Sequence, residues 1–511
     1  MRRWFSAEAG IFLGIWLVLM LVGRSALFRD PGTFWHVVVG ERMLEQGQVI
    51  QADPFSFTFP GKPWVAHQWL AECGMAAVHR IGGFDGLLLV AATLLAGIYT
   101  WVASRLLRAG FHLLPVGCVL ALVLLASSHQ FHVRPLVLSI GMLGITFALL
   151  VDVESGRRNL WQLGWLVPLV ALWANLHAGV LAGLGTMGLV AAGWCLAWLL
   201  GKGDSPVRRG RDAIVLAVLL LACGFCVLIN PYGLGLPRAW LNTLTIPLPE
   251  LIQEHAPLDL TDPLGWTVVL LGAGYVVALA GVFPKWPRAT WLVPLVWLVL
   301  ACGRVRNVPL FAITAAIAAA EMLPRTRWAG WLKDREMFLP PDESEPAAAG
   351  RCGWAAVTLP LVLVAAAGLL QLAGISGPVV GRGWAKLDPA QWPVELLPEL
   401  QRLNETAPDG TPVFNDLHFG GFLIYHTPRL RVFIDDRCAL YGGEFLGQYD
   451  RARRENPSQV DAWQTRYGFR HALVETGSAL DGYLQSSASW KMTGRTPVAT
   501  LYQLSPPASG G

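Results

Sequence analysis

Charged residues are scarce in this sequence. Only 14% of its 511 residues are Asp, Glu, Lys or Arg, whereas a soluble domain usually carries about 25%. The scarcity excludes a chain that is soluble along its whole length, because 54% of the residues are hydrophobic and they form long blocks that require lipid. Acidic residues are almost absent from the centres of these blocks, which argues against a transporter with charges deep inside its spans.

Cysteine and metal-ligand patterns are also sparse. The eight cysteines lie mostly within or beside apolar blocks and show no disulfide framework. Cys223 and Cys226 form a CxxC inside an apolar block without partner ligands, which we interpret as packing in the lipid phase. The acids and histidines present could hold a divalent metal, but no spacing of them enforces a metal site, so we predict no cofactor. The net charge of +4 is small and its positive residues lie in short loops, so we expect no nucleic-acid partner.

The apolar blocks predict a polytopic α-helical membrane protein with about eleven transmembrane helices. Arg2 and Arg3 precede the first block, but no small-x-small cleavage site follows, so we interpret it as an uncleaved span. The predicted spans are 10–28, 84–104, 113–127, 135–151, 161–175, 178–200, 212–229, 264–283, 289–303, 307–323 and 354–375.

Basic residues mark alternate loops between these spans. They are Arg2, Arg3, Arg105, Arg108, Arg157, Arg158, Lys202, Arg208, Arg209, Arg211, Lys285, Arg288, Arg325, Arg327, Lys333 and Arg335. The positive-inside rule assigns these loops to the cytoplasm. An odd number of spans then predicts a multi-pass protein of the inner or plasma membrane, with a cytoplasmic N-terminus and an extracytoplasmic C-terminal domain.

The end of the chain has the alternating pattern of a small soluble α/β domain. Strands are expected at 412–415, 431–434, 472–474 and 499–503, with helices near 394–404, 443–453 and 460–467. The predicted division is a transmembrane domain at 1–382, with a first outer loop at 29–83 and a Pro- and acid-rich cytoplasmic linker at 324–353, followed by the soluble domain at 383–511.

The first outer loop is predicted to hold two interfacial helices. Residues 32–46 form an amphipathic pattern, with Phe34, Val37, Val38, Met43 and Leu44 expected to face lipid. A second short helix is expected at 67–80. Two such helices between the first and second spans are an unusual arrangement.

Nearly all the unusual polar residues fall on the predicted outer side. The first loop holds Asp30, Trp35, His36, Glu41, Trp64, His67, Trp69 and Glu72, and later turns hold His132, Arg134, Asn175, His177, Arg304 and Arg306. Ionisable groups at a membrane boundary are costly and tend to mark sites. We therefore predict one external cavity in which acids, imidazoles and guanidinium groups surround an anionic headgroup.

Each of these residues also has a plain structural interpretation. The outer tryptophans fit an interfacial aromatic belt, and the outer histidines fit hydrogen-bonded interfacial residues. Arg304 and Arg306 would snorkel to lipid phosphates, and Asp30 would pair with Arg29. Asp435–Arg437, which follows a predicted strand, would bind an acceptor or a cation; we favour a strand-end turn with an arginine pair inside the domain.

Several motifs carry a family resemblance. They are Asp30-Pro31-Gly32-Thr33-Phe34-Trp35-His36, Gly40-Glu41, Asp53-Pro54-Phe55-Ser56-Phe57, Trp64-x-x-His67-x-Trp69-Leu70-x-Glu72, Trp173-Ala174-Asn175-Leu176-His177, Asn230-Pro231-Tyr232-Gly233, Asn415-Asp416, Gly420-Gly421 and Phe433-Ile434-Asp435-Asp436-Arg437. These motifs resemble bacterial membrane proteins grouped near the polytopic C-type glycosyltransferases, the GT-C superfamily. That superfamily includes protein O-mannosyltransferases, aminoarabinose transferases and rhizobial lipopolysaccharide sugar transferases.

The resemblance implies transfer of a sugar from a polyprenyl-phosphate donor to a hydroxyl acceptor at the outer face of the membrane. An acid of the first outer loop is the base in that superfamily, and Asp30 matches its position. Glu41 and Glu72 are both candidates for a second acid. The sequence departs from the family where Pro31 follows Asp30, since paired acids are common there.

On this interpretation the remaining candidate residues bind substrate. Arg134, Arg304 or Arg306 would neutralise the leaving phosphate, and His67, His132 or His177 would protonate it or hydrogen-bond to it. His36 and Asn175 are also candidate substrate-binding residues. The expected partners are a lipid-linked sugar donor and a glycan, lipid or protein of the cell envelope. A lipid or glycolipid transporter and a non-catalytic membrane scaffold are the alternative functions.

Overall fold

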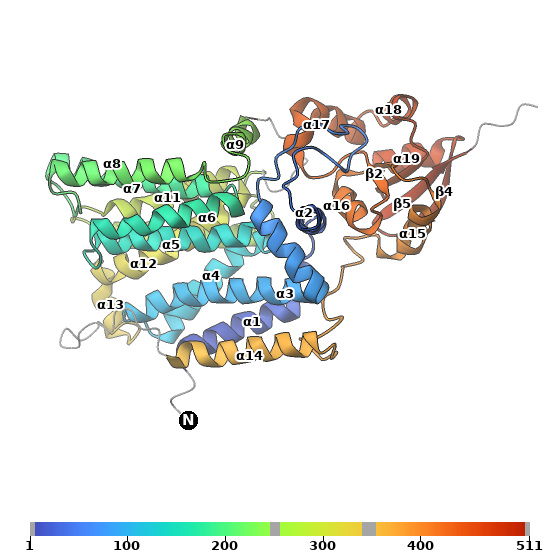
Figure 1. Cartoon of the computed structure of the whole chain (residues 1–511). Helices are drawn as coiled ribbons and strands as arrows, with labels where there is room; N and C mark the ends of the chain where they lie inside the picture. Colours follow the sequence, from blue (N-terminus) through green and yellow to red (C-terminus); the bar gives the residue numbers. More distant parts are fainter. Residues whose placement is uncertain (1–5, 246–255, 340–353, 506–511) are drawn as a thin grey trace, which may run out of the picture.

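The computed structural model describes residues 6–245, 256–339 and 354–505. They form a helical bundle with an α/β domain at one end of it (Figure 1). We call this end of the bundle the domain end and the opposite end the far end. Much of the predicted linker, at 340–353, lies outside the described residues.

Each of the eleven predicted spans coincides with a helix of the bundle. These helices are α1 (Ala7–Ala26), α3 (Trp69–Arg108), α4 (Leu113–Ser127), α5 (Leu136–Glu154), α6 (Leu166–Leu176), α7 (Val180–Leu200), α8 (Gly210–Cys226), α10 (Pro263–Ala280), α11 (Ala289–Gly303), α12 (Val308–Met322) and α14 (Trp354–Leu372). In the described ranges, seven helices are long and apolar enough to cross a membrane. The prediction of a polytopic membrane protein is confirmed.

Helix α12 lies at the centre of the bundle. It packs against α3, α4, α5, α10 and α11. Its sequence is rich in alanine, and small side chains let neighbouring helices approach closely where no hydrophobic effect drives them together. Large apolar side chains such as Leu199, Leu221 and Val299 are exposed on the outside of the bundle, as expected of a surface that contacts lipid.

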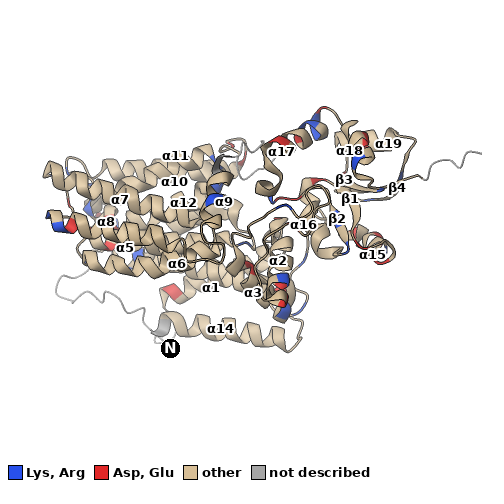
Figure 2. Cartoon of the chain, turned by 45° about the horizontal axis from the view of Figure 1, so that its top comes forward, with Lys and Arg blue, Asp and Glu red and all other residues tan. Residues whose placement is uncertain are grey.

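Charged residues gather at the far end of the bundle (Figure 2). Arg105 Nη2 lies 2.6 Å from Asp152 Oδ1, and Arg157 pairs with both Asp152 and Glu321. The short α13 (Trp328–Asp334) lies in the loop that follows α12. The loops predicted to be cytoplasmic therefore share one end of the bundle; which side of the membrane that end faces stays a prediction.

The first loop contains α2 (Gly32–Gln46), at the predicted residues. Figure 1 shows it between the bundle and the α/β domain. Phe34 and Val37 are fully buried, and the Phe34 ring lies 4.9 Å from the ring of Trp392 in the C-terminal domain. The expectation that these side chains face lipid was wrong, because an apolar helix face can be covered by protein as well as by lipid.

The second predicted interfacial helix is the first part of α3. It continues into the second span through Gly83, whose backbone (φ 58°, ψ −151°) is not helical. A positive φ favours glycine, which has no Cβ to clash. The two predicted helices therefore follow each other directly and meet at a sharp kink at Gly83.

The C-terminal domain is a five-stranded sheet with helices, which confirms the predicted α/β class. Its elements are α15 (Leu397–Thr406), β1 (Thr411–Asn415), α16 (Leu417–His426), β2 (Leu430–Val432), α17 (Cys438–Arg454), α18 (Gln459–Tyr467), β3 (His471–Glu475), α19 (Ala479–Ser486), β4 (Trp490–Arg495) and β5 (Ala499–Leu504). The strand order is β2-β1-β3-β5-β4. β1 is parallel to β2 and β3, whereas β5 is antiparallel to both neighbours. Strand β4 and helices α16 and α19 were not predicted.

The first loop packs into this domain. The backbone N–H of Val432 donates to Phe55 O at 3.1 Å, and that of Phe57 donates to Val432 O at 3.1 Å, so the loop extends the sheet beside β2. Phe34, Phe55 and Trp64 belong to the same apolar core as the domain's own side chains. The boundary near residue 383 stays a prediction.

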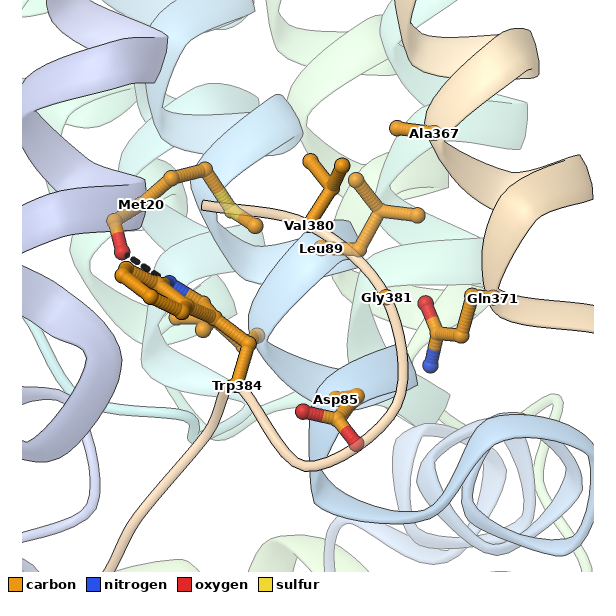
Figure 3. Close-up of a pocket in the computed structure, with 9 residues that line it drawn as sticks. Met20, Asp85, Leu89, Ala367, Gln371, Val380, Gly381 and Trp384 are labelled. Atoms are coloured by element: carbon orange, nitrogen blue, oxygen red, sulfur yellow. Dashed lines mark hydrogen bonds between the residues drawn. The ribbon is translucent and has the colours of Figure 1, made fainter. Parts of the chain in front are cut away.

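The segment that joins α14 to the domain is fastened to the bundle. The Trp384 indole donates to Met20 O at 2.7 Å, and the backbone N–H groups of Gly383 and Ala385 donate to the Asp85 carboxylate (Figure 3). These contacts enclose a hollow of about 10 Å³, room for roughly one water molecule. The hollow is part of this attachment and is too small for a ligand.

Candidate active site

A cavity of about 1650 Å³ lies between the domain end of the bundle and the C-terminal domain. The predicted site residues that line it are Asp30, His67, His132, Arg134, His177, Arg304 and Arg306. The structure therefore brings together residues that the sequence spreads over four outer segments. The C-terminal domain contributes Asp416, His418, Asp436, Arg453 and Glu475 to the same cavity.

Asp30 is held at the start of α2. Its Oδ1 accepts a hydrogen bond from the Gly32 N–H at 2.7 Å, and its Oδ2 lies 2.7 Å from Arg134 Nη1. The side chain is largely buried but reaches the cavity. The alternative pairing with Arg29 is not formed, because Arg29 lies 3.6 Å from Asp388 instead. Asp30 is thus a fixed carboxylate beside a guanidinium group.

Asp436 is a second carboxylate at the same place. Its Oδ1 accepts a hydrogen bond from the Trp35 indole at 2.6 Å. Burial first, and then the charge of Asp30, raise the pKa of Asp436 to about 8. The raised pKa favours the neutral form of its carboxyl group, which can both donate and accept hydrogen bonds.

Gly32 is the point where these groups converge. A Cβ atom at Gly32 would lie 2.7 Å from Asp30 Oδ1, 3.2 Å from Arg134 Nε and 3.3 Å from Asp436 Oδ2. Any side chain here would push these groups apart. The glycine is required by this close approach, since φ at this position is not positive.

The histidines of the cavity are positioned to give hydrogen bonds. The N–H of Gly179 donates to His177 Nδ1 at 2.9 Å, so the proton of neutral His177 is on Nε2. The hydroxyl of Ser139 also lies 2.7 Å from His177 Nδ1. Burial lowers the pKa of His67 to about 4, with Arg306 and Arg134 acting in the same direction. His67 is therefore neutral at pH 7 and serves as a hydrogen-bonding group, not as a cation.

Four predicted residues do not line the cavity. Glu41 forms a surface ion pair with Arg80, at 3.1 Å. The side-chain amide of Asn175 accepts from the Trp69 indole at 2.8 Å and donates to two backbone carbonyls, which ties α6 to its neighbours.

His36 and Glu72 form a buried pair behind the cavity wall. His36 Nδ1 lies 2.9 Å from Glu72 Oε1, and both side chains are almost fully buried. Burial lowers the pKa of His36 well below its ordinary value, and the charge of Arg134 acts in the same direction. This pair lies next to the site without reaching the cavity.

The turn after β2 separates two kinds of acid. Arg437 forms two hydrogen bonds with Asp435, at 2.8 and 2.7 Å, and an ion pair with Asp53 of the first loop at 2.8 Å. The favoured interpretation, an arginine pair inside the domain, is therefore correct for Asp435. Asp436 differs because its carboxylate points into the cavity.

The acids of the C-terminal domain follow a recognisable rule. Asp416 directly follows β1, Asp436 follows β2, and Glu475 ends β3. Ligands of α/β sheets bind beyond the carboxyl ends of parallel strands, and this edge of the sheet faces the bundle. The sequence showed the strands but not that they are parallel, which is why Asp416 was given no role beyond its motif and Asp436 was interpreted as structural.

An apolar wall extends from the polar part of the cavity. It is formed by one face of α1 with residues of α4 and α7, namely Gly14, Ile15, Val18, Leu19, Val22, Leu124, Leu125, Leu181 and Ala182. Val18 and Val22 are more than half exposed. The cavity thus joins a group of arginines and carboxylates to a surface suited to an alkyl chain.

Solved structures share this architecture. The apo oligosaccharyltransferase of Archaeoglobus fulgidus matches 92% of this chain and 69% of its own, with 12% identity and a TM-score of 0.52. The same enzyme tethered to an acceptor peptide matches 91% of this chain and 69% of its own, with 13% identity and a TM-score of 0.51. Neither a protein-family model nor a curated protein sequence matches the chain.

ArnT of Cupriavidus metallidurans, in a structure with undecaprenyl phosphate, matches 99% of this chain and 100% of its own. Its identity is 14% and its TM-score is 0.47, which is too low to support a conclusion. The oligosaccharyltransferase match shows the fold alone. The sequence motifs predicted a likeness to membrane glycosyltransferases, and the match to the archaeal oligosaccharyltransferase bears out that likeness for the fold.

Proposed function

We propose that this protein transfers a sugar from a polyprenyl-phosphate donor to a hydroxyl acceptor. The observation that carries the proposal is the Asp30–Arg134 pair, which lies in a cavity that continues along the apolar face of α1. A lipid-linked sugar phosphate has the same two parts, an anionic head and a long alkyl chain.

Asp30 acts as the general base in this proposal. The acceptor hydroxyl has a pKa far above 7 and needs a positioned carboxylate to take its proton. As the new bond forms between the acceptor oxygen and the anomeric carbon, the bond from that carbon to the phosphate oxygen breaks. The phosphate leaves with the electron pair, and a single displacement inverts the anomeric configuration.

The leaving phosphate is stabilised by the basic side of the cavity. Arg134, Arg304 and Arg306 line it, and guanidinium groups suit the planar geometry of phosphate oxygens. His177 Nε2–H adds a hydrogen bond. The sugar transfer takes place on the extracytoplasmic side, since the basic far-end loops are assigned to the cytoplasm.

The first experiment measures release of undecaprenyl phosphate from synthetic undecaprenyl-phosphate pentoses and hexoses. The full-length protein in lipid nanodiscs is compared with Asp30→Asn, which keeps the shape of the side chain but cannot take a proton. We expect a loss of about 10²–10⁴-fold in turnover. Asp409→Asn, at an exposed position of the C-terminal domain, is the matched control. Equal turnover by folded Asp30→Asn, or no turnover of any donor by the natural protein, would refute the proposal.

A second experiment tests the lipid wall. Val18→Trp narrows the apolar surface of the cavity, whereas Leu21→Trp adds the same bulk to α1 at a residue outside the cavity. We expect Val18→Trp to weaken binding of undecaprenyl phosphate about tenfold, equivalent to ~1.4 kcal/mol, and Leu21→Trp to leave it unchanged. If Val18→Trp and Leu21→Trp changed the binding of undecaprenyl phosphate equally, the lipid would not bind at this wall. That result would favour the transporter or the scaffold.

A further inference from the structure

Two carboxylates from distant parts of the chain meet in the cavity. Asp30 comes from the end of α1, and Asp436 comes from the turn after β2. The hydrogen bond from Trp35 to Asp436 joins residues 401 positions apart in sequence. The two carboxylates are close because both approach Gly32, within 2.7 and 3.3 Å of where its Cβ would be.

The pair is not symmetrical. Asp30 Oδ1 accepts a hydrogen bond from the Gly32 N–H, and Asp30 Oδ2 accepts a charge-assisted hydrogen bond from Arg134. Asp436 is held by the Trp35 indole, a neutral donor. The charged groups that act on Asp436 are Asp30, Arg134 and Asp435. One acid is therefore suited to remove a proton, and the other to share hydrogen bonds with a neutral ligand.

Aromatic side chains line the cavity beside the pair, namely Trp35, Trp64 and His418. The ring of His418 stacks on that of Trp392, with centroids 4.5 Å apart and an interplanar angle of 8°. His418 lines the cavity and lies near enough to Asp30 to be influenced by its charge. Pockets for small polar molecules usually combine such apolar faces with a few fixed polar groups.

We propose that Asp30 and Asp436 together bind a vicinal diol, so that the acceptor is a saccharide or another polyol and not a molecule with one isolated hydroxyl. Asp30 takes the proton of the attacking hydroxyl, and Asp436 binds the neighbouring hydroxyl without taking part in bond formation. Asp436 is thus an acceptor-binding residue that the C-terminal domain supplies. The inference rests on the proposed sugar transfer and adds the class of acceptor to it.

The experiment compares two small acceptors that differ by one hydroxyl. Ethylene glycol is the simplest vicinal diol, and ethanol is its counterpart with a single hydroxyl. The full-length protein in nanodiscs is given an undecaprenyl-phosphate sugar that it hydrolyses, with each alcohol in turn, and the glycoside products are quantified. We expect a preference for ethylene glycol of about tenfold or more, because a site built for a hydroxyl rejects an analogue that lacks it.

The variant Asp436→Asn keeps an oxygen that can accept from the Trp35 indole. Its amide nitrogen can only donate a hydrogen bond, whereas the second oxygen of a neutral carboxyl group can both donate and accept. We expect it to raise the KM for ethylene glycol about tenfold more than it affects transfer to ethanol or hydrolysis by water. Asp436→Glu should restore part of the preference, and Asp409→Asn should leave it unchanged.

Three outcomes decide the matter. A preference that is lost only in Asp436→Asn supports the inference. A preference that survives Asp436→Asn, or an equal fall in transfer to both alcohols and to water, overturns it while leaving the sugar transfer intact. Absence of donor turnover in the natural protein overturns the sugar transfer itself, and the acceptor role with it.

Discussion

Arg134 Nη1 lies 2.7 Å from Asp30 Oδ2, and this ion pair connects the segment before α5 to the end of α1. The arginine lies at the domain end, where the positive-inside rule disfavours it if that end is extracytoplasmic. Its position is explained by two anions, the Asp30 carboxylate and the phosphate of the proposed donor. In the proposed reaction, this one guanidinium group would align the base with the leaving group.

Arg134→Lys keeps the positive charge but removes the planar fork of donors. We expect the affinity for undecaprenyl phosphate to fall about tenfold, equivalent to ~1.4 kcal/mol, measured by titration of the protein in nanodiscs. Arg402→Lys, on the exposed side of α15, is the control. Unchanged affinity in Arg134→Lys would mean that the phosphate does not contact this residue.

Gly32→Ala tests the convergence of the three charged groups. The added methyl group would lie 2.7 Å from Asp30 Oδ1, a distance that forces the carboxylate to move. A shift of about 1 Å at a reacting group can cost about 10²-fold in rate, so we expect a loss of that order in donor turnover. Gly74→Ala is the control, because a Cβ atom there meets nothing within 4 Å. Similar turnover in the two variants would show that Asp30 does not need its present position.

Arg437→Met tests the attachment of the C-terminal domain. The side chain is 1% exposed, and its loss leaves the carboxylates of Asp53 and Asp435 buried without their partner. Removing one member of a buried ion pair costs about 3–5 kcal/mol, so we expect a clearly lower Tm of the full-length protein. Arg429→Met removes an exposed pair at 4.0 Å, which is worth about 0–1 kcal/mol. An equal Tm in the two variants would contradict the role given to Arg437.

The raised pKa of Asp436 makes the stability of the folded protein depend on pH. Its pKa rises from 3.8 to about 8 on folding, so between these values the unfolded chain has released a proton that the folded protein keeps. The stability that this group contributes is complete below about pH 4 and is lost as pH rises toward 8. We expect the Tm difference between the natural protein and Asp436→Asn to change across this window and to level off above it. A constant difference from pH 4 to 9 would contradict the neutral carboxyl group.

The bundle was predictable because its signal is local. Each span is a continuous apolar block, and its helix satisfies its own backbone. The grouping of Asp30, Arg134 and Arg304 was also predictable, since loop alternation alone places them on one side. The same argument wrongly placed Glu41 and Asn175 in the cavity. In the structure Glu41 pairs with Arg80 and Asn175 with Trp69, both outside the cavity.

The contacts between the bundle and the C-terminal domain were not predictable in the same way. An apolar face such as that of Phe34 does not reveal whether lipid or protein covers it. The role of Asp436 depends on β2 lying parallel to β1 and on the docking of the whole domain. Both are long-range pairings, and a single sequence carries no local pattern for them.

The strand-like pairing of Phe55 and Phe57 with Val432 has a consequence for biosynthesis. The first loop is synthesised early and its partner strand β2 late. The aromatic residues of the loop therefore have no partner in the domain until the other helices have been inserted. The entropic cost of closing a loop increases only slowly with chain length, so the long separation adds little to the cost of this pairing. The pairing nevertheless makes the folding of each end of the polypeptide depend on the other. If the chain were divided where its composition changes from apolar to polar, the transmembrane fragment would keep the first loop and the soluble fragment would lose it. Each fragment would then lack part of the apolar core that the two share.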